Sequence, residues 1–389
     1  MKITIISTAY PLRGGIAQYS AILYHKLKQN GHEVTVITFK RQYPKLLFPG
    51  KTQLETSAEE AVRIPSEPIL DSIGPLSWIR VGKRVRQLQP DLILFKFWLP
   101  FFAPAFGVIC WLAKKWTRAR ILYICDNVLP HEKRPGDLAL TRFAFKRADY
   151  FIVQSKVVEQ ELLALVPQAN YKRIPHPVYD IFGAARKKQD ARRQLGLADE
   201  RIILFFGYVR AYKGLDLLLR ALPEILREIE LKVLVVGEFY EPEKKYRALM
   251  QELDITGAVR IHSEFVPNEE VGPYFSAADV LVLPYKSATQ SGIVQLAYHF
   301  NKPCIVTDVG GLAEVVVDGK TGFVVPPDDA SPLAQAVIEF YRQEKESEFS
   351  ANVEQEKKKY SWQRMIAGIE AFGGGCPKRP EMSFRPKGG

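Results

Sequence analysis

Cysteine is scarce in this sequence of 389 residues. Only four are present, and their spacing matches neither a disulfide framework nor a metal-binding motif: Cys110, Cys125, Cys304 and Cys376. Unpaired thiols are typical of proteins in a reducing compartment. We therefore expect a cytoplasmic protein without structural disulfides.

Long hydrophobic runs are also missing. The longest candidate, residues 95–116, has an apolar part of about 17 residues, near the lower limit for a membrane span, and Pro100 and Pro104 interrupt it. We expect a strand end, a loop and a buried helix here. The alternative is a shallow membrane contact through aromatic residues flanked by cations, namely Phe101, Phe102, Trp111 and Trp116 beside Lys114, Lys115, Arg118 and Arg120. The N-terminus has one lysine and a short apolar run, which favours a first β-strand over a signal peptide.

Acidic residues are few in the first half of the chain. Residues 1–180 contain 26 lysines and arginines against 14 acidic residues, whereas the remainder contains 28 against 29. A solvated basic face explains this excess, and so does contact with an anionic membrane surface or an anionic acceptor. Nucleic acid is not expected as a partner, because no recognition-helix pattern or stacking motif is present.

The length of the chain favours two domains. Short apolar runs indicate buried strands at residues 3–7, 34–39, 91–95, 120–124 and 150–153, and again at 202–206, 232–236, 259–262, 280–284, 303–307 and 322–325. Helical patterns separate these strands, as at residues 15–30 and 214–228. Alternating strands and helices predict parallel sheets covered on both faces, so the expected fold class is α/β with two doubly wound, Rossmann-like domains.

The boundary between the domains is expected near residues 180–190. Pro175 and Pro177 stiffen the chain there, and a basic, polar stretch follows. Ligands of doubly wound sheets bind outside the carboxyl ends of the strands. The functional residues are therefore expected where the strand ends of the two domains face each other across a cleft.

The turn after the strand expected at 202–206 combines glycines with two cations. It begins at Gly207, contains Arg210 and Lys213, and ends at Gly214 before a helix. Arginine can bind two phosphate oxygens at once, and lysine acts as a point charge. A basic surface turn would contain the same residues, but the place between strand and helix suits a diphosphate.

Small and polar residues precede the helix expected at 293–300. They are Ser287, Thr289, Gln290, Ser291 and Gly292, with Gln295 one turn into the helix. Such a turn lets a phosphate approach the backbone, and the helix dipole favours an anion. An ordinary helix cap has the same composition. Farther on, Gly310 and Gly311 permit a tight turn before Glu314.

Two candidate groups lie in the first half. Gly14 and Gly15 follow the first strand and open a helix, and they can admit a sugar or phosphate close to the backbone. They lack the G-x-G-x-x-G spacing of a dinucleotide-binding turn, which disfavours an NAD-dependent oxidoreductase. Asp126 and His131 follow the strand expected at 120–124 and are candidates for an acceptor-side site, although a lone histidine is more often structural.

In this order, the segments resemble the family 4 glycosyltransferases, retaining enzymes of the GT-B fold. The resemblance covers roughly residues 1–372. It rests on Gly14-Gly15-Ile16, Gly207 to Gly214, Ala278-Asp279-Val280, residues 287–295 and Gly310-Gly311 with Glu314. The family implies transfer of a hexosyl-type sugar from a UDP- or GDP-sugar to a glycan or lipid-linked acceptor, in polysaccharide or cell-envelope synthesis. No metal or other cofactor is implied.

The resemblance also assigns parts to the chain. Residues 1–183 would bind the acceptor, residues 184–360 the donor, residues 361–372 would form a helix crossing back to the N-terminal domain, and residues 373–389 a disordered basic tail. Arg210 and Lys213 would bind the donor diphosphate and act in catalysis with Asp126 and His131. The implied donor-binding residues are Gly207, Ser287, Thr289, Gln290, Ser291, Gly292 and Gln295, and Gly14 and Gly15 form the acceptor-side loop. The cysteine usage predicts work in the cytoplasm, and the basic first half predicts a peripheral place on the inner face of the plasma membrane as the alternative.

Three departures from the family pattern accompany this assignment. Tyr208 stands where the family has arginine, so Arg210 is the expected substitute. Ser287 and Gln295 stand where the family commonly has two glutamates, and Asp126 stands at the acceptor-side histidine. The missing glutamates keep open a catalytically silent relative that binds nucleotide-sugars. The two-domain architecture keeps open a sugar-nucleotide epimerase of the same fold.

Overall fold

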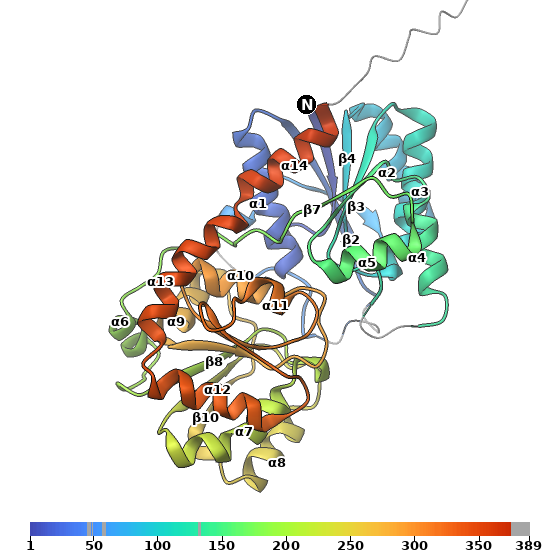
Figure 1. Cartoon of the computed structure of the whole chain (residues 1–389). Coiled ribbons are helices and arrows are strands. Elements are labelled where there is room, and N and C mark those ends of the chain that lie inside the picture. The colour runs from blue at the N-terminus through green and yellow to red at the C-terminus, as the bar shows by residue number, and fades with distance from the viewer. Residues whose placement is uncertain (45–47, 49, 57–59, 131–133, 375–389) are drawn as a thin grey trace, which may run out of the picture.

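Two parallel α/β units, one above the other in Figure 1, make up the protein. The structure is a computed structural model that describes residues 1–44, 48, 50–56, 60–130 and 134–374. His131 and the tail residues 375–389 therefore lie outside the described residues. The expected fold class, with two Rossmann-like domains, is confirmed.

The first unit is built on a seven-stranded sheet of order β3-β2-β1-β4-β5-β6-β7. Its strands are β1 (Lys2–Ile6), β2 (Glu33–Arg41), β3 (Glu67–Asp71), β4 (Leu92–Phe97), β5 (Arg120–Cys125), β6 (Tyr150–Val153) and β7 (Tyr171–Arg173). The helices are α1 (Gly15–Gln29), α2 (Pro75–Leu88), α3 (Ala103–Trp116), α4 (Asp137–Phe145) and α5 (Lys156–Leu165). The central strand β4 is buried along its whole length, as expected for an apolar run covered on both faces.

The second unit has a six-stranded sheet of order β10-β9-β8-β11-β12-β13. Its strands are β8 (Ile202–Phe206), β9 (Lys232–Val236), β10 (Val259–His262), β11 (Val280–Leu283), β12 (Cys304–Thr307) and β13 (Gly322–Val325). The helices are α6 (Lys188–Gln194), α7 (Leu215–Glu228), α8 (Glu243–Glu252), α9 (Asn268–Ala277), α10 (Gly292–His299), α11 (Leu312–Val315), α12 (Ala330–Arg342) and α13 (Glu346–Glu356).

Strand order reverses at one place in each sheet. The chain runs outward to one side from β1 and then returns to the other side at β4, and it does the same at β8 and β11. A crevice forms at the carboxyl ends of the strands where the order reverses. The loops after β1, β5, β8, β9 and β11 therefore meet between the two units.

The last helix, α14 (Trp362–Gly374), leaves the second unit and lies along α1 of the first (Figure 1). The Glu370 carboxylate is 2.9 Å from His32 Nε2, and Arg120 donates to the Phe372 carbonyl at 2.6 Å. The Trp362 indole donates to the Val178 carbonyl at 2.9 Å. These contacts join α14 to the first unit and to the segment that follows β7.

The apolar segment 95–116 forms the end of β4, a short turn and helix α3, as expected from its prolines. Phe102 is completely buried, while Trp111 is 46% exposed. Among the described residues, no helix has both the length and the apolar character needed to cross a membrane.

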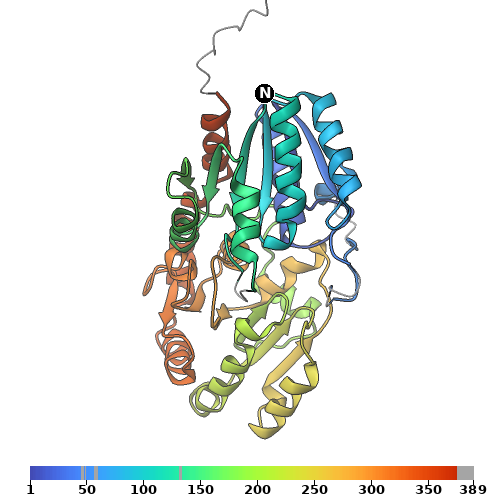
Figure 2. The ribbon, with the colours of Figure 1, turned by 90° about the vertical axis from the view of Figure 1, so that its right-hand side faces the viewer.

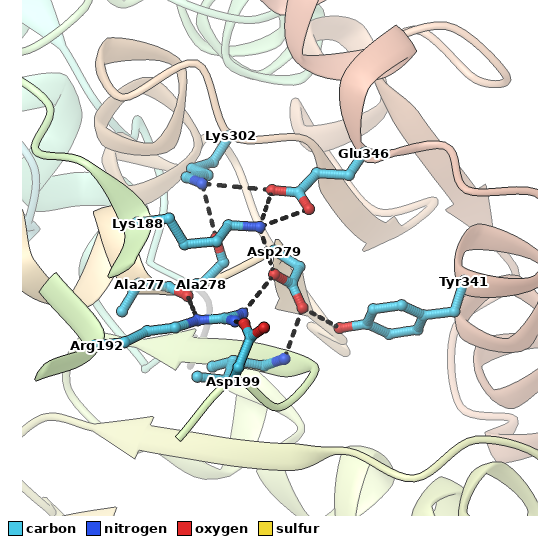
Figure 3. Close-up of polar contacts among 10 residues, drawn as sticks. Lys188, Arg192, Asp199, Ala277, Ala278, Asp279, Lys302, Tyr341 and Glu346 are labelled. Carbon is cyan, nitrogen blue, oxygen red and sulfur yellow. Dashed lines mark hydrogen bonds and ion pairs between the residues drawn. The ribbon is translucent and has the colours of Figure 1, made fainter. Parts of the chain in front are cut away.

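A buried carboxylate anchors the second unit at the amino end of β11 (Figure 3). Asp279, 4% exposed, accepts hydrogen bonds from the Ile202 backbone at 2.7 Å and from Arg192 at 2.9 Å. Lys188 and Tyr341 donate to the same carboxylate at 2.7 and 3.2 Å. The carboxylate thereby ties β8, α6 and α12 together, at the end of the sheet opposite the cleft.

Candidate functional site

The turn after β8 brings the two predicted phosphate-binding cations together. Gly207 and Gly214 both have positive φ, at 106° and 67°. A Cβ on Gly214 would lie 1.9 Å from the Pro284 carbonyl oxygen, so only glycine fits there. The tight turn directs Lys213 back over Gly207: its Nζ lies 3.1 Å from where a Gly207 Cβ would stand.

Lys213 is a buried cation without a counter-ion in the part of the chain that the structure describes. Its side chain is 8% exposed, and its Nζ lies 5.5 Å from the centroid of the Tyr285 ring. Burial, and secondly the charge of Arg210, lower the pKa of Lys213 to about 7. Arg210 is exposed, stacks over Tyr240 at 4.9 Å and forms no ion pair with a described residue. Two unpaired cations in one crevice favour an anionic ligand.

The N-terminus of α10 lies beside the same turn. Ile293 Cδ1 is 3.4 Å from the position of a Gly207 Cβ, so the first turn of the helix approaches Lys213. No side chain caps the helix, because the N-cap residue Ser291 makes no capping hydrogen bond. The first N–H groups of α10 are thus available to an anion.

Donor affinity is expected to fall with rising pH because of Lys213. Its charged form predominates below the pKa of about 7 and is the form that attracts a diphosphate. Between pH 7 and 9 the affinity for a nucleotide-sugar should decrease, approaching about tenfold per pH unit. Titration calorimetry over this range measures the slope. An affinity that stays constant from pH 6 to 9 would contradict the role given to this ammonium group.

Residues of the loop between β11 and α10 bind the first unit directly. Gln290 donates to the Asp126 carboxylate at 2.6 Å, and Thr289 donates to the side-chain oxygen of Asn127. Asp126 also forms an ion pair with Lys96, whose Nζ is 2.5 Å away. The predicted acceptor-side Asp126 and the predicted donor-side Gln290 are therefore in contact across the cleft.

Gln295 lines a cavity whose lining does not include Lys213. This cavity, of about 260 Å³, lies between the units and is lined by Gln290, Ser291 and Gln295 together with Gln154, His176 and Glu314. Gln295 is 1% exposed, and both polar atoms of its amide lack a hydrogen-bond partner among the described residues. Burial lowers the pKa of His176 to about 3, so its imidazole is neutral. The predicted donor-binding residues thus divide between two places.

The glycine loop of the first unit reaches the second unit as well. Gly14 has φ of 104°, and a Cβ there would lie 3.5 Å from the Tyr208 hydroxyl. Tyr179 donates to the Gly15 carbonyl at 3.2 Å, and its ring would lie 3.0 Å from a Cβ on Gly292. Tyr179 therefore fills the space between Gly15 and the start of α10. Ser287 is half-buried in the loop after β11.

Arg13 and Glu238 form a buried ion pair between the two units that the sequence did not indicate. Both side chains are 4% exposed, and the guanidinium lies 4.2 Å from the centroid of the Phe265 ring. The other Glu238 oxygen accepts the Lys51 backbone N–H at 2.6 Å. Glu238 follows Gly237, whose backbone lies against that of Gly207. The pair therefore closes the cleft beside the turn that carries Lys213.

Removing Arg13 should destabilise the protein because Glu238 would remain buried without its partner. We expect Arg13→Met to lower the free energy of unfolding by about 3 kcal/mol, as is usual when one partner of a buried ion pair is removed. Thermal unfolding measures the change. The matched control, Lys2→Met, breaks an exposed pair with Glu33 and should cost less than about 1 kcal/mol. Equal losses in the two variants would contradict this account of the Arg13–Glu238 pair.

Models of known protein families match both units. Residues 14–177 match the model described as glycosyl transferase 4-like domain, and residues 200–343 match the model described as glycosyl transferases group 1. The chain belongs to the group 1 glycosyltransferases. The resemblance seen in the sequence is thereby confirmed.

Relatives of this glycosyltransferase match it over most of its length. An uncharacterized glycosyltransferase of Methanocaldococcus jannaschii is 27% identical over 361 residues, 87% of this chain and 88% of the relative. A GDP-mannose-dependent phosphatidylinositol monomannoside mannosyltransferase of Mycolicibacterium smegmatis is 26% identical over 347 residues, 84% of this chain and 85% of the relative. The structure of Anabaena HepE in complex with UDP-glucose superposes with a TM-score of 0.74 and 19% identity, covering 96% of this chain and 99% of that one. The fold is thus GT-B.

One departure of this glycosyltransferase from its family has a structural counterpart. Tyr208, in the place of the family arginine, packs against Tyr240 with ring centroids 4.7 Å apart. Arg210 stacks over the same Tyr240 ring. Tyr240 thus contacts both Tyr208 and the expected substitute Arg210, which lies two positions farther along the turn. Among the described residues, no group of three or more His, Cys, Asp or Glu side chains could hold a metal ion.

Proposed function

We propose that this protein transfers a hexosyl-type sugar from a UDP- or GDP-sugar to a glycan or lipid-linked acceptor, with retention of configuration. The observation that carries the proposal is the pair of unpaired cations, Arg210 and Lys213, beside the uncapped start of α10. These groups suit a diphosphate. The UDP-glucose bound by HepE and the GDP-mannose used by the mycobacterial relative support the donor class.

In this proposal the residues of the second unit stabilise the leaving group. Cleavage of the donor bond builds negative charge on the diphosphate and positive charge on the sugar ring. Lys213, Arg210 and the first N–H groups of α10 stabilise the negative charge on the diphosphate, and no metal ion takes part. Gly207 allows the diphosphate to approach the backbone closely. Lys213 acts in a site with little water, where an ammonium group is worth more than at the surface.

The first unit receives the acceptor across the cleft. Asp126 is held by Lys96 and by Gln290, which places a carboxylate at the boundary between the units. We propose that Asp126 contacts the acceptor or the transferred sugar and that the Gly14–Gly15 loop borders it. The Thr289–Asn127 and Gln290–Asp126 hydrogen bonds hold the units closed, which excludes water and suppresses donor hydrolysis. His131 lies outside the described residues, and its part in catalysis on the acceptor side stays a proposal.

In this scheme the Gln295 side chain binds the ribose of the donor. A neutral amide can both donate hydrogen bonds to sugar hydroxyls and accept hydrogen bonds from them. The amide nitrogen and oxygen of the buried Gln295 have no hydrogen-bond partner among the described residues. Ser287, Ser291 and Gly292 lie on the same connection between β11 and α10 and border the donor.

A panel of nucleotide-sugars tests the proposal. The purified protein is incubated with each UDP- and GDP-sugar, and nucleotide release and the sugar product are followed by NMR. We expect slow release of UDP or GDP with one donor class, and an anomeric configuration that is retained. Binding without release would indicate a catalytically silent relative, and interconversion of donors without an acceptor would indicate an epimerase. Either outcome would overturn the proposal.

A further inference from the structure

Buried polar side chains that lack a hydrogen-bond partner gather at the cleft. Among the described residues, seven contain such atoms, and each lies between the carboxyl end of a strand and the first turn of the next helix. These strand ends lie between the two units, which Figure 2 shows one above the other. Six of the seven residues follow β1, β10 or β11, namely Thr8, Arg13, Asn268, Tyr285, Gln290 and Gln295. Because buried polar groups are rarely left unpaired in folded proteins, such a gathering indicates a ligand site.

Tyr285 lies beside the buried cation of this cleft. The side chain is 3% exposed, and the centroid of its ring is 5.5 Å from Lys213 Nζ. Its hydroxyl has no hydrogen-bond partner among the described residues. The proposed function has so far given this hydroxyl no part.

The Tyr285 hydroxyl lies near the start of α10 and is protonated. Burial, and secondly the neighbouring Tyr212, raise the pKa of Tyr285 above its usual value, and the Ser291 side chain opposes this shift. Ser291 is the N-cap residue of α10, and its side chain is near the hydroxyl without forming a hydrogen bond of acceptable geometry. A protonated phenol can donate a hydrogen bond. A free donor thus stands close to the uncapped helix N-terminus.

Contacts on several sides fix the position of Tyr285. The residue follows Pro284, whose carbonyl oxygen packs against Gly214 in the turn after β8. The Tyr285 carbonyl accepts a hydrogen bond from the Thr307 hydroxyl at the end of β12. The rings of Tyr285 and Tyr212 meet edge to face, with centroids 6.1 Å apart. Tyr285 is therefore held in place before any ligand binds, as an effective binding group must be.

We propose that the Tyr285 hydroxyl donates a hydrogen bond to the diphosphate of the donor, beside the ammonium group of Lys213, and is a further catalytic residue. This step rests on the proposed function. A hydrogen bond to a charged oxygen is about twice as strong as one between neutral groups, so a donor in this place favours an anion. Negative charge grows on the diphosphate as the donor bond breaks, and the hydrogen bond should strengthen with it.

The unpaired hydroxyl also has a consequence for stability. A buried hydroxyl without a partner destabilises the free protein, because it has lost its hydrogen bonds to water. Tyr285→Phe removes the hydroxyl and keeps the ring, so the melting temperature should stay the same or rise. The matched control is Tyr298→Phe on α10. The buried Tyr298 hydroxyl forms hydrogen bonds with the Val315 carbonyl at 3.0 Å and the Thr321 hydroxyl at 2.8 Å, so its removal should lower the melting temperature.

Calorimetry with UDP and GDP tests the proposal on the full-length wild type and both variants. We expect Tyr285→Phe to bind the nucleoside diphosphate at least about tenfold more weakly than the wild type, and to bind the nucleoside without phosphates equally well. Release of the nucleotide from the preferred donor should be slowed at least about tenfold in kcat. Tyr298→Phe should keep the wild-type affinity and turnover despite its lower melting temperature.

Wild-type affinity for the diphosphate in Tyr285→Phe would overturn the proposal, and a lower melting temperature of that variant would then assign the hydroxyl a structural role. Losses of equal size for the diphosphate and the nucleoside would overturn it too, because the hydroxyl would then contact the nucleoside. A wild-type protein that binds neither UDP nor GDP would contradict the proposed function and this inference together. Binding without sugar transfer would contradict the proposed function alone, and the affinities would still decide the role of Tyr285.

Discussion

Replacing Lys213 by alanine should lower turnover with the donor by more than a hundredfold, which corresponds to about 3 kcal/mol of lost transition-state stabilisation. The ammonium is 8% exposed and lies over Gly207, where the diphosphate can approach the backbone. No carboxylate pairs with it among the described residues, so its charge is free to interact with the leaving group. The loss should appear in kcat as well as in donor affinity, because the lysine charge attracts the bound diphosphate and the charge on the diphosphate grows further in the transition state.

Lys244→Ala is the matched control for this variant. Lys244 is exposed on α8 of the same unit, and its replacement should leave kcat unchanged. Stopped-time assays of nucleotide release with the preferred donor measure both variants, and circular dichroism confirms that they are folded. If Lys213→Ala turned over the donor at the wild-type rate, Lys213 could not be the residue that stabilises the diphosphate, whatever the result for Lys244→Ala.

Replacing Asp279 by alanine should be the most destabilising change in the second unit. The carboxylate is 4% exposed and receives hydrogen bonds from Arg192, Lys188, Tyr341 and the Ile202 backbone. Its removal leaves the 6%-exposed Arg192 and a backbone N–H without this partner. We expect the free energy of unfolding to fall by about 3–5 kcal/mol, as when one partner of a buried ion pair is removed.

Asp199→Ala provides the control within the same network. Its carboxylate also pairs with Arg192, at 2.8 Å, but it is 87% exposed, so its removal should cost less than about 1 kcal/mol. Urea unfolding followed by tryptophan fluorescence and circular dichroism measures both. At low temperature the folded Asp279→Ala protein should keep the wild-type KM for the donor, because Asp279 lies at the far end of the sheet. A raised KM with unchanged stability would mean that Asp279 belongs to the site.

Much of the fold could be predicted from hydrophobic periodicity. Every strand of the second sheet was predicted, because each is a short apolar run between polar turns. Two strands of the first sheet, β3 and β7, were missed. Strand β3 contains Pro68 and lies at an edge, and β7 is three mostly polar residues at the other edge. Edge strands need less burial than central ones, so their sequences lack the apolar signal.

The candidate site could be predicted where its residues are neighbours in sequence. Arg210 and Lys213 lie together in the structure because one turn carries both. Gln295 lines a cavity with His176, since its direction depends on the phase of α10 and not on its spacing from Ser287. Lys96 pairs with Asp126 because β4 and β5 are neighbours in the first sheet, which only the strand order reveals. Arg13 pairs with Glu238 across the two units, which only the closed arrangement of the strand ends reveals.

The central claim is that Lys213 and its turn bind the diphosphate of a nucleotide donor. Calorimetric affinities of the wild type and of Lys213→Ala for UDP or GDP, each compared with the nucleoside that lacks the phosphates, test it most directly. We predict that the wild type binds the diphosphate at least about a hundredfold more tightly than the nucleoside, and that most of this difference disappears in Lys213→Ala. A difference of the same size in both proteins would show that the diphosphate binds elsewhere and would contradict the account.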